Sequence, residues 1–338
     1  MNTYEITPQI PLKSGFGPQT TAREVLKGID LRGKTVIVTG GYSGIGLETT
    51  RALAESGATV IVPARTLERA RASVENIPRV QVEEMDLMNP ASIDAFSQKF
   101  LSSGRALDIL INNAGIMAAP LSRDARGFES QFATNHLGHF QLTARLWPAL
   151  KQAGNARVVS LSSTGIRFGG VDFDDPNFQH REYNEWVAYG QSKSANALFA
   201  VELDRRGHKY GVRAFSVHPG RILGTNLIRY MTKEDPVKNA IQNLSSKDVE
   251  KQRGESGEQN IEQGAATSVW CATSPQLEGK GGVYCMNVDI ANAIPASSVN
   301  GELMQVMTGV LPWAIDPKLA ERLWKLSEDL TGVIFEVN

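Results

Sequence analysis

The sequence predicts an α/β protein with a doubly wound parallel sheet, in which helices cover both faces of the sheet and make three layers. Two observations support this fold class. Short runs rich in Val and Ile alternate with longer helix-forming segments along most of the 338 residues, which is the pattern of parallel strands joined by helical crossovers. The first run, residues 34–39, leads into a glycine-rich turn at residues 40–46 and then into a helical segment.

Each strand is expected where a short apolar run suits burial on both faces of a sheet. The expected strands are residues 34–39, 59–63, 80–85, 107–111, 158–161, 213–217 and 282–286. The expected helices are residues 47–56, 67–76, 90–101, 128–150, 189–203 and 262–272. No internal repeat and no linker splits this series, so we expect a single domain over residues 31–290.

Both ends of the chain are expected to be extensions of this domain. Residues 1–30 form an N-terminal arm in which Pro and Gly interrupt any helical or strand periodicity of apolar residues. One short helix is expected within it, at residues 21–26. Residues 291–338 form a C-terminal extension with a terminal amphipathic helix at residues 317–330, capped by Asp316. The apolar face of that helix is expected at Leu319, Leu323, Leu326 and Leu330.

Two segments inside the domain do not fit the alternating pattern. Residues 164–187 hold five aromatic side chains among Gly and Asp, so we expect a loop with little regular structure. Residues 226–261 are charged and rich in Ser and Gly, so we expect a mobile helical excursion that covers the site as a lid. Together they predict a roomy and largely apolar substrate pocket.

Composition and charge exclude several classes of protein. Hydrophobic residues make up 41% of the chain and charged residues 21%, as in globular proteins with a full core. The net charge of −1 comes from interspersed acids and bases, which does not suit a nucleic-acid or anionic-membrane surface. Cys271 and Cys285 form no C-x-x-C pair, so neither a disulfide framework nor a metal site is expected. No signal peptide and no apolar stretch of ~20 residues is present, so we expect a soluble, cytoplasmic protein without a membrane anchor.

The glycine-rich turn is a candidate nucleotide site. Many α/β proteins carry Gly at such a turn without a ligand, but the strand–turn–helix order favours a dinucleotide, whose diphosphate would lie at the helix N-terminus. The end of the second strand, where an acid would bind the ribose hydroxyls of NAD, carries Arg65 and no acid. A guanidinium suits a 2′-phosphate, so Arg65, alone or together with Arg69, could pair with one. NADP(H) is therefore favoured, with NAD(H) and a plain surface arginine as the alternatives.

Tyr189 and Lys193 form a candidate acid/base pair. Four positions apart on a helix, they project from the same face. A fixed positive charge favours the ionised form of a phenol, which otherwise titrates too high to act at neutral pH. The pair alone is weak evidence, because the same spacing occurs by chance in many helices. Its meaning depends on the rest of the chain.

Other polar residues follow the expected strands or interrupt a helix. Asn113 comes directly after the fourth strand, and Ser162 and Ser163 end the fifth, at the edge of the sheet where ligands bind. Turn or loop residues are the alternative explanation. Asn135 lies in the middle of an expected helix, where Asn is unfavourable unless its side chain has a specific structural or functional role. The neighbouring histidines, at positions 136 and 139, have no third metal ligand and are interpreted as packing or hydrogen-bonding residues.

Taken together, these motifs resemble the classical short-chain dehydrogenase/reductase family over roughly residues 30–290. The matching motifs are Thr39-Gly40-x-x-x-Gly44-Ile45-Gly46, Asn112-Asn113-Ala114-Gly115, Asn135, Ser163, Tyr189-x-x-x-Lys193 and Pro219-Gly220. Residues 131–142, 189–196 and 271–275 are most similar to the branch of retinol dehydrogenases and WW-domain oxidoreductases. The resemblance implies a Rossmann-type fold and an enzyme that uses NAD(P).

The resemblance also implies roles for four catalytic residues. Tyr189 would exchange the proton of the carbinol or carbonyl oxygen, and Lys193 would lower the pKa of the tyrosine and hold the nicotinamide ribose. Ser163 would hydrogen-bond the substrate oxygen, and Asn135 would hold a water that links Lys193 to solvent. The implied cofactor contacts are Gly40, Tyr42, Ser43, Gly44, Ile45, Gly46, Arg65, Asp86, Leu87, Asn113, Ala114, Gly115, Tyr189, Lys193, Pro219, Gly220 and Ile222. The family's threonine after Pro-Gly appears one position late, as Thr225.

The sequence therefore predicts an NADP(H)-dependent oxidoreductase that interconverts an alcohol and a ketone or aldehyde on a small hydrophobic substrate. The cofactor supplies the hydride chemistry, and the protein supplies position and a proton. The alternative is a non-catalytic protein that senses NADP on the same fold. The family resemblance further implies a homodimer or homotetramer, because the long helices before and at Tyr189 often pair between subunits.

Overall fold

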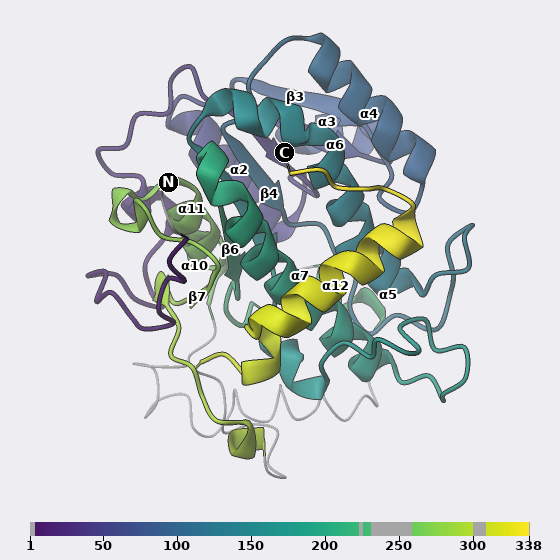
Figure 1. Ribbon diagram of the computed structural model, residues 1–338. Coiled ribbons are helices and arrows are strands. Elements are labelled where there is room, and N and C mark those ends of the chain that lie inside the picture. The colour runs from purple at the N-terminus through teal and green to yellow at the C-terminus, as the bar shows by residue number, and fades with distance from the viewer. Residues whose placement is uncertain (1–3, 223–225, 231–258, 300–308, 338) are drawn as a thin grey trace.

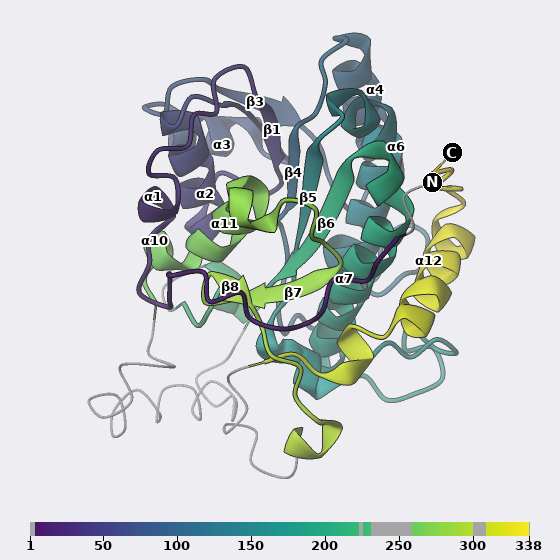
Figure 2. The ribbon, with the colours of Figure 1, turned by 60° about the vertical axis from the view of Figure 1, so that its left-hand side comes forward.

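An eight-stranded sheet lies between two layers of helices in the computed structural model (Figures 1 and 2). The structure describes residues 4–222, 226–230, 259–299 and 309–337. The strand order is β3-β2-β1-β4-β5-β6-β7-β8, and all neighbours are parallel except β7 and β8. The strands are β1 Thr35–Val38, β2 Thr59–Ala64, β3 Val80–Glu84, β4 Ile109–Asn112, β5 Ala156–Leu161, β6 Val212–Val217, β7 Val283–Met286 and β8 Asp289–Ile290. The predicted three-layer, doubly wound fold is confirmed.

The two helical layers enclose separate hydrophobic cores on the two faces of the sheet (Figure 2). Because successive side chains of a strand point to opposite faces, Val36 and Val38 pack in one core and Ile37 in the other. The first layer holds α2 Gly44–Glu55, α3 Leu67–Val74 and α11 Ala266–Thr273. The second holds α4 Pro90–Ser102, α6 Gly138–Ala153 and α7 Glu185–Gly207. Short 3-10 turns are η2 Thr164–Phe168, η3 His208–Tyr210, η4 Asn226–Tyr230, η5 Pro275–Leu277, η6 Ala296–Val299 and η7 Pro312–Ala314.

The helix expected at residues 128–150 is three pieces instead of one. A short α5 (Ser130–Phe132) passes into a π-helix, η1 (Ala133–Leu137), and then into α6. Asn135 lies in the π-helix, and its side chain bonds both backbone groups of Ile116 in the loop after β4. A π turn is rare and usually marks a functional position. The periodic apolar pattern could not reveal it, because the cause is a contact with a distant loop.

Two other predicted helices differ in their bounds. The segment expected at residues 262–272 is divided at Ala265 into α10 (Ile261–Gly264) and α11. Helix α7 begins at Glu185, not at Tyr189, because the Asn184 side chain accepts hydrogen bonds from the first free backbone N–H groups. Tyr189 therefore lies in the second turn of a helix that is already formed.

The N-terminal arm follows the β7–β8 edge of the sheet (Figure 2). The Gln9 side chain accepts from the backbone N–H of Tyr284 and donates to its carbonyl, as a neighbouring strand would. The Asp289 carboxylate accepts from the backbone of Leu12 and Ser14. The arm thus covers a sheet edge that would otherwise be open to another chain.

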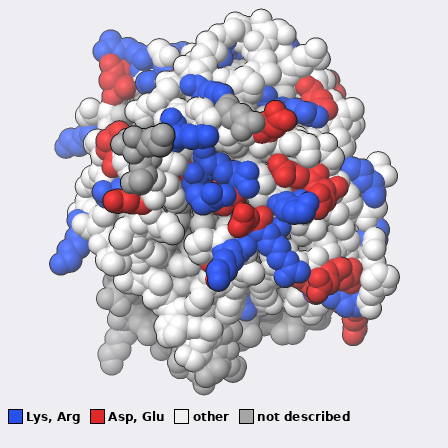
Figure 3. Space-filling view, in the orientation of Figure 1, with Lys and Arg blue, Asp and Glu red and all other residues white. Residues whose placement is uncertain are grey.

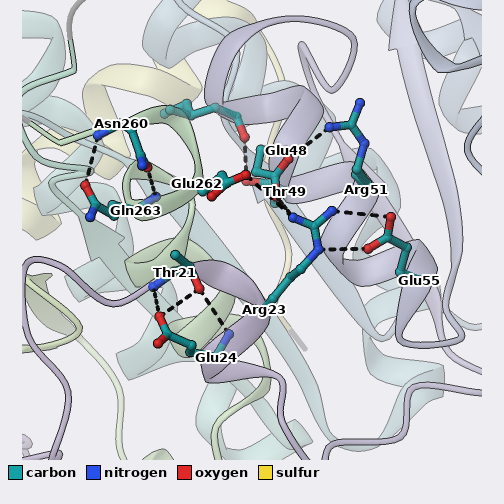
Figure 4. A network of polar contacts seen from close by, with 11 residues as sticks. Thr21, Arg23, Glu24, Glu48, Thr49, Arg51, Glu55, Asn260, Glu262 and Gln263 are labelled. Carbon is teal, nitrogen blue, oxygen red and sulfur yellow. Dashed lines mark hydrogen bonds and ion pairs between the residues drawn. The ribbon is translucent and has the colours of Figure 1, made fainter.

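The arm also contacts the helix that follows the glycine-rich turn. Its short helix α1 (Ala22–Val25) is closed by a capping box between Thr21 and Glu24, as expected at residues 21–26. Arg23 on α1 forms ion pairs with Glu48 and Glu55 of α2, each at 3.1 Å (Figure 4).

The C-terminal helix α12 (Pro317–Thr331) packs along α7 (Figure 1, yellow). Asp316 caps it as predicted. Of the four predicted leucines, Leu323 is buried and Leu319 and Leu330 pack against the same core, but the largest buried side chain of the helix is Trp324, which is 1% exposed. The Trp324 ring lies 5.3 Å from that of Phe140 on α6 and 5.9 Å from that of Phe199 on α7. Thus α12 covers apolar faces of both long helices.

Charged side chains of both signs mix on the face that α7 and α12 share (Figure 3). For example, Arg206 pairs with Glu202 at 2.6 Å. No helix in the described part of the chain is long and apolar enough to cross a membrane. Most of the excursion expected at residues 226–261, and Thr225 before it, lie outside the described residues.

Candidate active site

A cavity of about 660 Å³ opens at the carboxyl ends of the strands, where the strand order reverses between β1 and β4. This is the position at which open α/β sheets bind ligands. Every residue predicted for catalysis or cofactor binding lines this cavity, except Asn135. Residues of β2, β5 and α7 and of the loops after β1, β4 and β6 therefore meet there, although 222 − 40 = 182 positions separate Gly40 from Ile222.

The glycine-rich turn leaves room and free donors for an anion. A Cβ on Gly46 would lie 2.4 Å from the Gly40 carbonyl oxygen and 2.5 Å from Asn113 Nδ2, so the close packing of this turn requires glycine. Ser43, at the N-cap of α2, makes no capping hydrogen bond with its side chain. The first N–H groups of α2 therefore lie at the cavity without a side-chain acceptor, as a diphosphate site requires. The turn fits a dinucleotide.

Two charged residues lie where the adenosine end of a dinucleotide would be expected. Arg65 follows β2, is exposed and lines the cavity; Arg69, one turn into α3, does not line it. Asp86 follows β3, and its Oδ1 accepts the backbone N–H of Met88 at 3.0 Å. No acid stands beside Arg65 at the end of β2.

Tyr189, Ser163 and Lys193 meet on one wall of the cavity. The Ser163 hydroxyl accepts the backbone N–H of Gly165 at 3.0 Å, which fixes its position at the end of β5. Lys193 Nζ donates to the Leu161 carbonyl at 3.0 Å and lies 5.7 Å from the centre of the Tyr189 ring. The three side chains expected for proton exchange are thus brought together.

Burial dominates the electrostatics of the pair. Burial raises the pKa of Tyr189 to about 12, against a smaller lowering by its hydrogen bond with Ser163. Burial also lowers the pKa of Lys193 to about 8. Loss of solvent around the phenol is therefore the dominant effect on the pKa of Tyr189, and the lowering by Lys193 that the family resemblance implies stays a prediction. At neutral pH the phenol keeps its proton, and Lys193 is mostly an ammonium.

Asn135 lies behind the cavity wall, next to Lys193. Its Oδ1 accepts from Ile116 N, and its Nδ2 donates to Ile116 O and to Ser192 Oγ, each at 2.9 Å. A Cβ on Gly115 would lie 3.1 Å from this Oδ1 and 3.4 Å from Lys193 Nζ, which shows how closely the three residues approach. Both Nδ2 hydrogens are thus donated inside the protein, and the side chain holds the loop after β4 against α7.

Sequence reasoning gave no role to several residues of the substrate side. Met117, Leu121 and Tyr230 line the cavity from the loop after β4 and from η4, and no pattern in the sequence marks them. Phe168 and Trp186 also line it, and their rings pack 5.2 Å apart. These two belong to the aromatic residues of 164–187 from which the sequence predicts an apolar substrate pocket.

A strand–glycine turn–helix segment beside Ser163 and the buried pair Tyr189 and Lys193 defines a nucleotide-dependent oxidoreductase. Comparison with known proteins agrees. The family model described as short chain dehydrogenase matches residues 34–236. The chain is 41% identical to the "Probable oxidoreductase" of Streptomyces antibioticus, over 89% of this chain and 98% of that protein. It is 36% identical to retinol dehydrogenase 12 of Homo sapiens, over 91% and 89% of the two chains.

The solved structure of an uncharacterised protein from Mycobacterium paratuberculosis superposes with a TM-score of 0.68 at 32% identity, covering 91% of this chain and 96% of that one. The chain belongs to the short-chain dehydrogenase/reductase family and is an enzyme of that family. The resemblance to the branch that includes the retinol dehydrogenases is confirmed.

Proposed function

We propose that this enzyme is an NADP(H)-dependent oxidoreductase that interconverts an alcohol and a ketone or aldehyde on a hydrophobic substrate. The observation that carries the proposal is the convergence of Tyr189, Ser163 and Lys193 on one cavity wall beside the glycine-rich turn. When bound, the nicotinamide supplies or accepts the hydride.

The protein residues then handle the substrate oxygen and its proton. Ser163 donates a hydrogen bond to that oxygen and orients it. Tyr189, protonated at neutral pH, donates its proton to a carbonyl oxygen that becomes an alcohol. The Lys193 ammonium, 5.7 Å from the ring centre, stabilises the negative charge that develops on the phenol. A protonated Tyr189 and a charged Lys193 at neutral pH therefore suit the reduction of a carbonyl group.

The preference for NADP(H) rests on Arg65. Its guanidinium lies on the rim of the cavity, where the 2′-position of the adenosine ribose is expected, and no acid competes for it at the end of β2. A hydrophobic substrate is supported by the apolar side chains that line the cavity near Tyr189. These are Ile116, Met117, Ala119, Pro120, Leu121, Phe168 and Trp186.

A turnover screen tests the proposal. NADPH and NADH oxidation would be followed by nicotinamide absorbance against a panel of apolar ketones and aldehydes, with Tyr189→Phe as the control. We expect turnover with NADPH that falls at least about 10²-fold in the variant, because the phenol proton is lost while the ring is kept. Binding of NADPH without turnover of any substrate would instead support the NADP-sensing alternative.

A cytoplasmic location and an assembly of two or four copies stay predictions of the sequence. Pairing through the two long helices, α6 and α7, would have to use faces other than those that α12 covers. Size-exclusion chromatography with light scattering would report the number of subunits.

A further inference from the structure

One buried histidine lies between the cofactor turn and the catalytic asparagine. His139, in the first turn of α6, is 1% exposed. Its Nε2 is 2.8 Å from the hydroxyl of Thr39, at the end of β1, and its Nδ1 is 2.9 Å from the backbone carbonyl of Asn135. The ring therefore connects the start of the glycine-rich turn to the π-helix.

The hydrogen-bond partners determine where each proton lies. A carbonyl oxygen can only accept, so Nδ1 carries the ring proton and donates it to Asn135. Nε2 is then an acceptor, and the Thr39 hydroxyl donates to it. The hydroxyl oxygen in turn accepts the backbone N–H groups of Asn113 and Ala114, each at 2.9 Å. Burial lowers the pKa of His139 to about 4, so this neutral tautomer persists at neutral pH.

One imidazole thus joins three segments of the candidate active site: the end of β1, the turn after β4 and the π-helix. Asn135 extends the connection, since its side chain bonds Ile116 and Ser192, the residue next to Lys193. We propose that His139 is a positioning residue that couples the cofactor turn to the Asn135–Lys193 side of the active site. This inference rests on the proposed function.

The alternative is that His139 only fills the core. His136, three residues earlier, shows what that would look like: it packs between the rings of Phe132 and Phe199, and its Nε2 contacts Ser327 of α12. His139 instead bonds the cofactor turn with one nitrogen and the π-helix with the other. Both bonds run toward residues that line or adjoin the cavity.

Substitutions separate the two bonds. His139→Asn keeps a donor at the Nδ1 position and loses the acceptor for Thr39, whereas His139→Gln keeps a polar group at the Nε2 position and loses the bond to Asn135. His139→Phe removes both, and Thr39→Val removes the hydroxyl from the other side. Thr143→Val is the matched control, because the Thr143 hydroxyl is equally buried one turn further along α6 and bonds only the His139 carbonyl and the Asn112 side chain.

For each variant we would measure the Kd of NADPH by calorimetry, kcat and KM for the best ketone, and the melting temperature. We expect His139→Phe and Thr39→Val each to weaken NADPH binding and to lower kcat about 10- to 100-fold, because small displacements in a catalytic site cost that much. The double variant His139→Asn with Thr39→Val should be no worse than Thr39→Val alone, since both changes remove the same His139–Thr39 hydrogen bond. His139→Asn, which loses the bond to Thr39, should mainly weaken NADPH binding, and His139→Gln, which loses the bond to Asn135, should mainly lower kcat. Thr39→Ser keeps the hydroxyl that Thr39→Val removes, so its NADPH affinity and kcat should match those of the wild-type enzyme.

Two results would overturn the role of His139. One is a His139→Phe variant that loses only melting temperature, as Thr143→Val is expected to, and keeps its NADPH affinity and kcat. The other is a double variant in which the separate effects of the His139 and Thr39 changes on kcat or Kd multiply. A wild-type protein that binds neither NADPH nor NADH would count against the proposed function itself. Failure of the His139 role can be told from failure of the proposed function, because the His139 variants are judged only against a wild-type enzyme that binds NADPH and reduces a ketone.

Discussion

Ser327 Oγ on the C-terminal helix lies 2.8 Å from His136 Nε2 in the π-helix, one residue from Asn135. The Ser327 hydroxyl already donates to the Leu323 carbonyl at 2.8 Å, so it accepts from the imidazole. Helix α12 therefore contacts the back of the segment that carries Asn135. Helix α12, which lies beyond the residues that the family resemblance covers, thus packs into the core of the domain.

Removing the Trp324 side chain should test this integration. The ring is 1% exposed and packs against Phe140, Phe199 and Phe335. Trp324→Ala should lower the free energy of unfolding by about 3–5 kcal/mol, as other large-to-small core changes do. Denaturant unfolding measures it, and exposed Lys325→Ala on the same helix is the control, expected within about 0.5 kcal/mol. Equal, small effects would show that α12 adds little to the fold.

The protein should lose stability steeply in mild acid. Burial lowers the pKa of His136 and His218 to about 3 and that of His139 to about 4. Below about pH 6.5 the unfolded chain binds protons that these folded residues do not, so stability present at neutral pH is lost as the pH falls toward 4, at about 1.4 kcal/mol per pH unit for each histidine. Burial raises the pKa of Glu129, which opposes this trend in part.

Urea unfolding between pH 7 and pH 5 measures that slope. His139→Gln should make it shallower by about 1.4 kcal/mol per pH unit, because one of the titrating groups is gone. An unchanged slope in this variant would mean that His139 is protonated in the folded protein.

The rate of ketone reduction should depend on the charge of Lys193. Burial lowers its pKa to about 8, while Tyr189 keeps its proton to about pH 12. The ammonium that stabilises the phenolate is present below pH 8 and lost above it, so kcat/KM, which reports the pKa values of the free enzyme, should fall as the pH rises through about 8. Lys193→Met should lower kcat by at least about 10²-fold and abolish that limb of the profile. A wild-type rate that stays constant from pH 7 to pH 10 would contradict the assignment.

Cofactor preference should depend on Arg65. Arg65→Ala should weaken NADPH binding about 10- to 100-fold, the worth of a charge-assisted hydrogen bond, and leave NADH binding unchanged. Arg69→Ala is the matched control, because Arg69 is an exposed neighbour that does not line the cavity. Equal weakening of both cofactors by Arg65→Ala would show that Arg65 does not contact the 2′-phosphate.

Local patterns were sufficient to predict the fold class, most strands and the motifs of the candidate site. The apolar runs and the glycine-rich turn at residues 40–46 act through local geometry, so their consequences are readable without coordinates. The antiparallel β8 was missed because two residues are too few to show an alternating pattern. The N-terminal arm could not be placed because the hydrogen bonds of Gln9 and Asp289 that hold it join residues 275 to 282 positions apart.

The sequence by itself therefore determined the doubly wound sheet, the position of the dinucleotide turn and the Tyr189–Lys193 spacing, because each depends on periodicity or on neighbours within one helix. Only the tertiary structure decided that Asn135 lies in a π-helix behind the cavity, that burial raises the pKa of Tyr189, and that α12 covers α6 and α7. Those properties arise from loss of solvent and from contacts between segments far apart in the chain, and no local pattern encodes them.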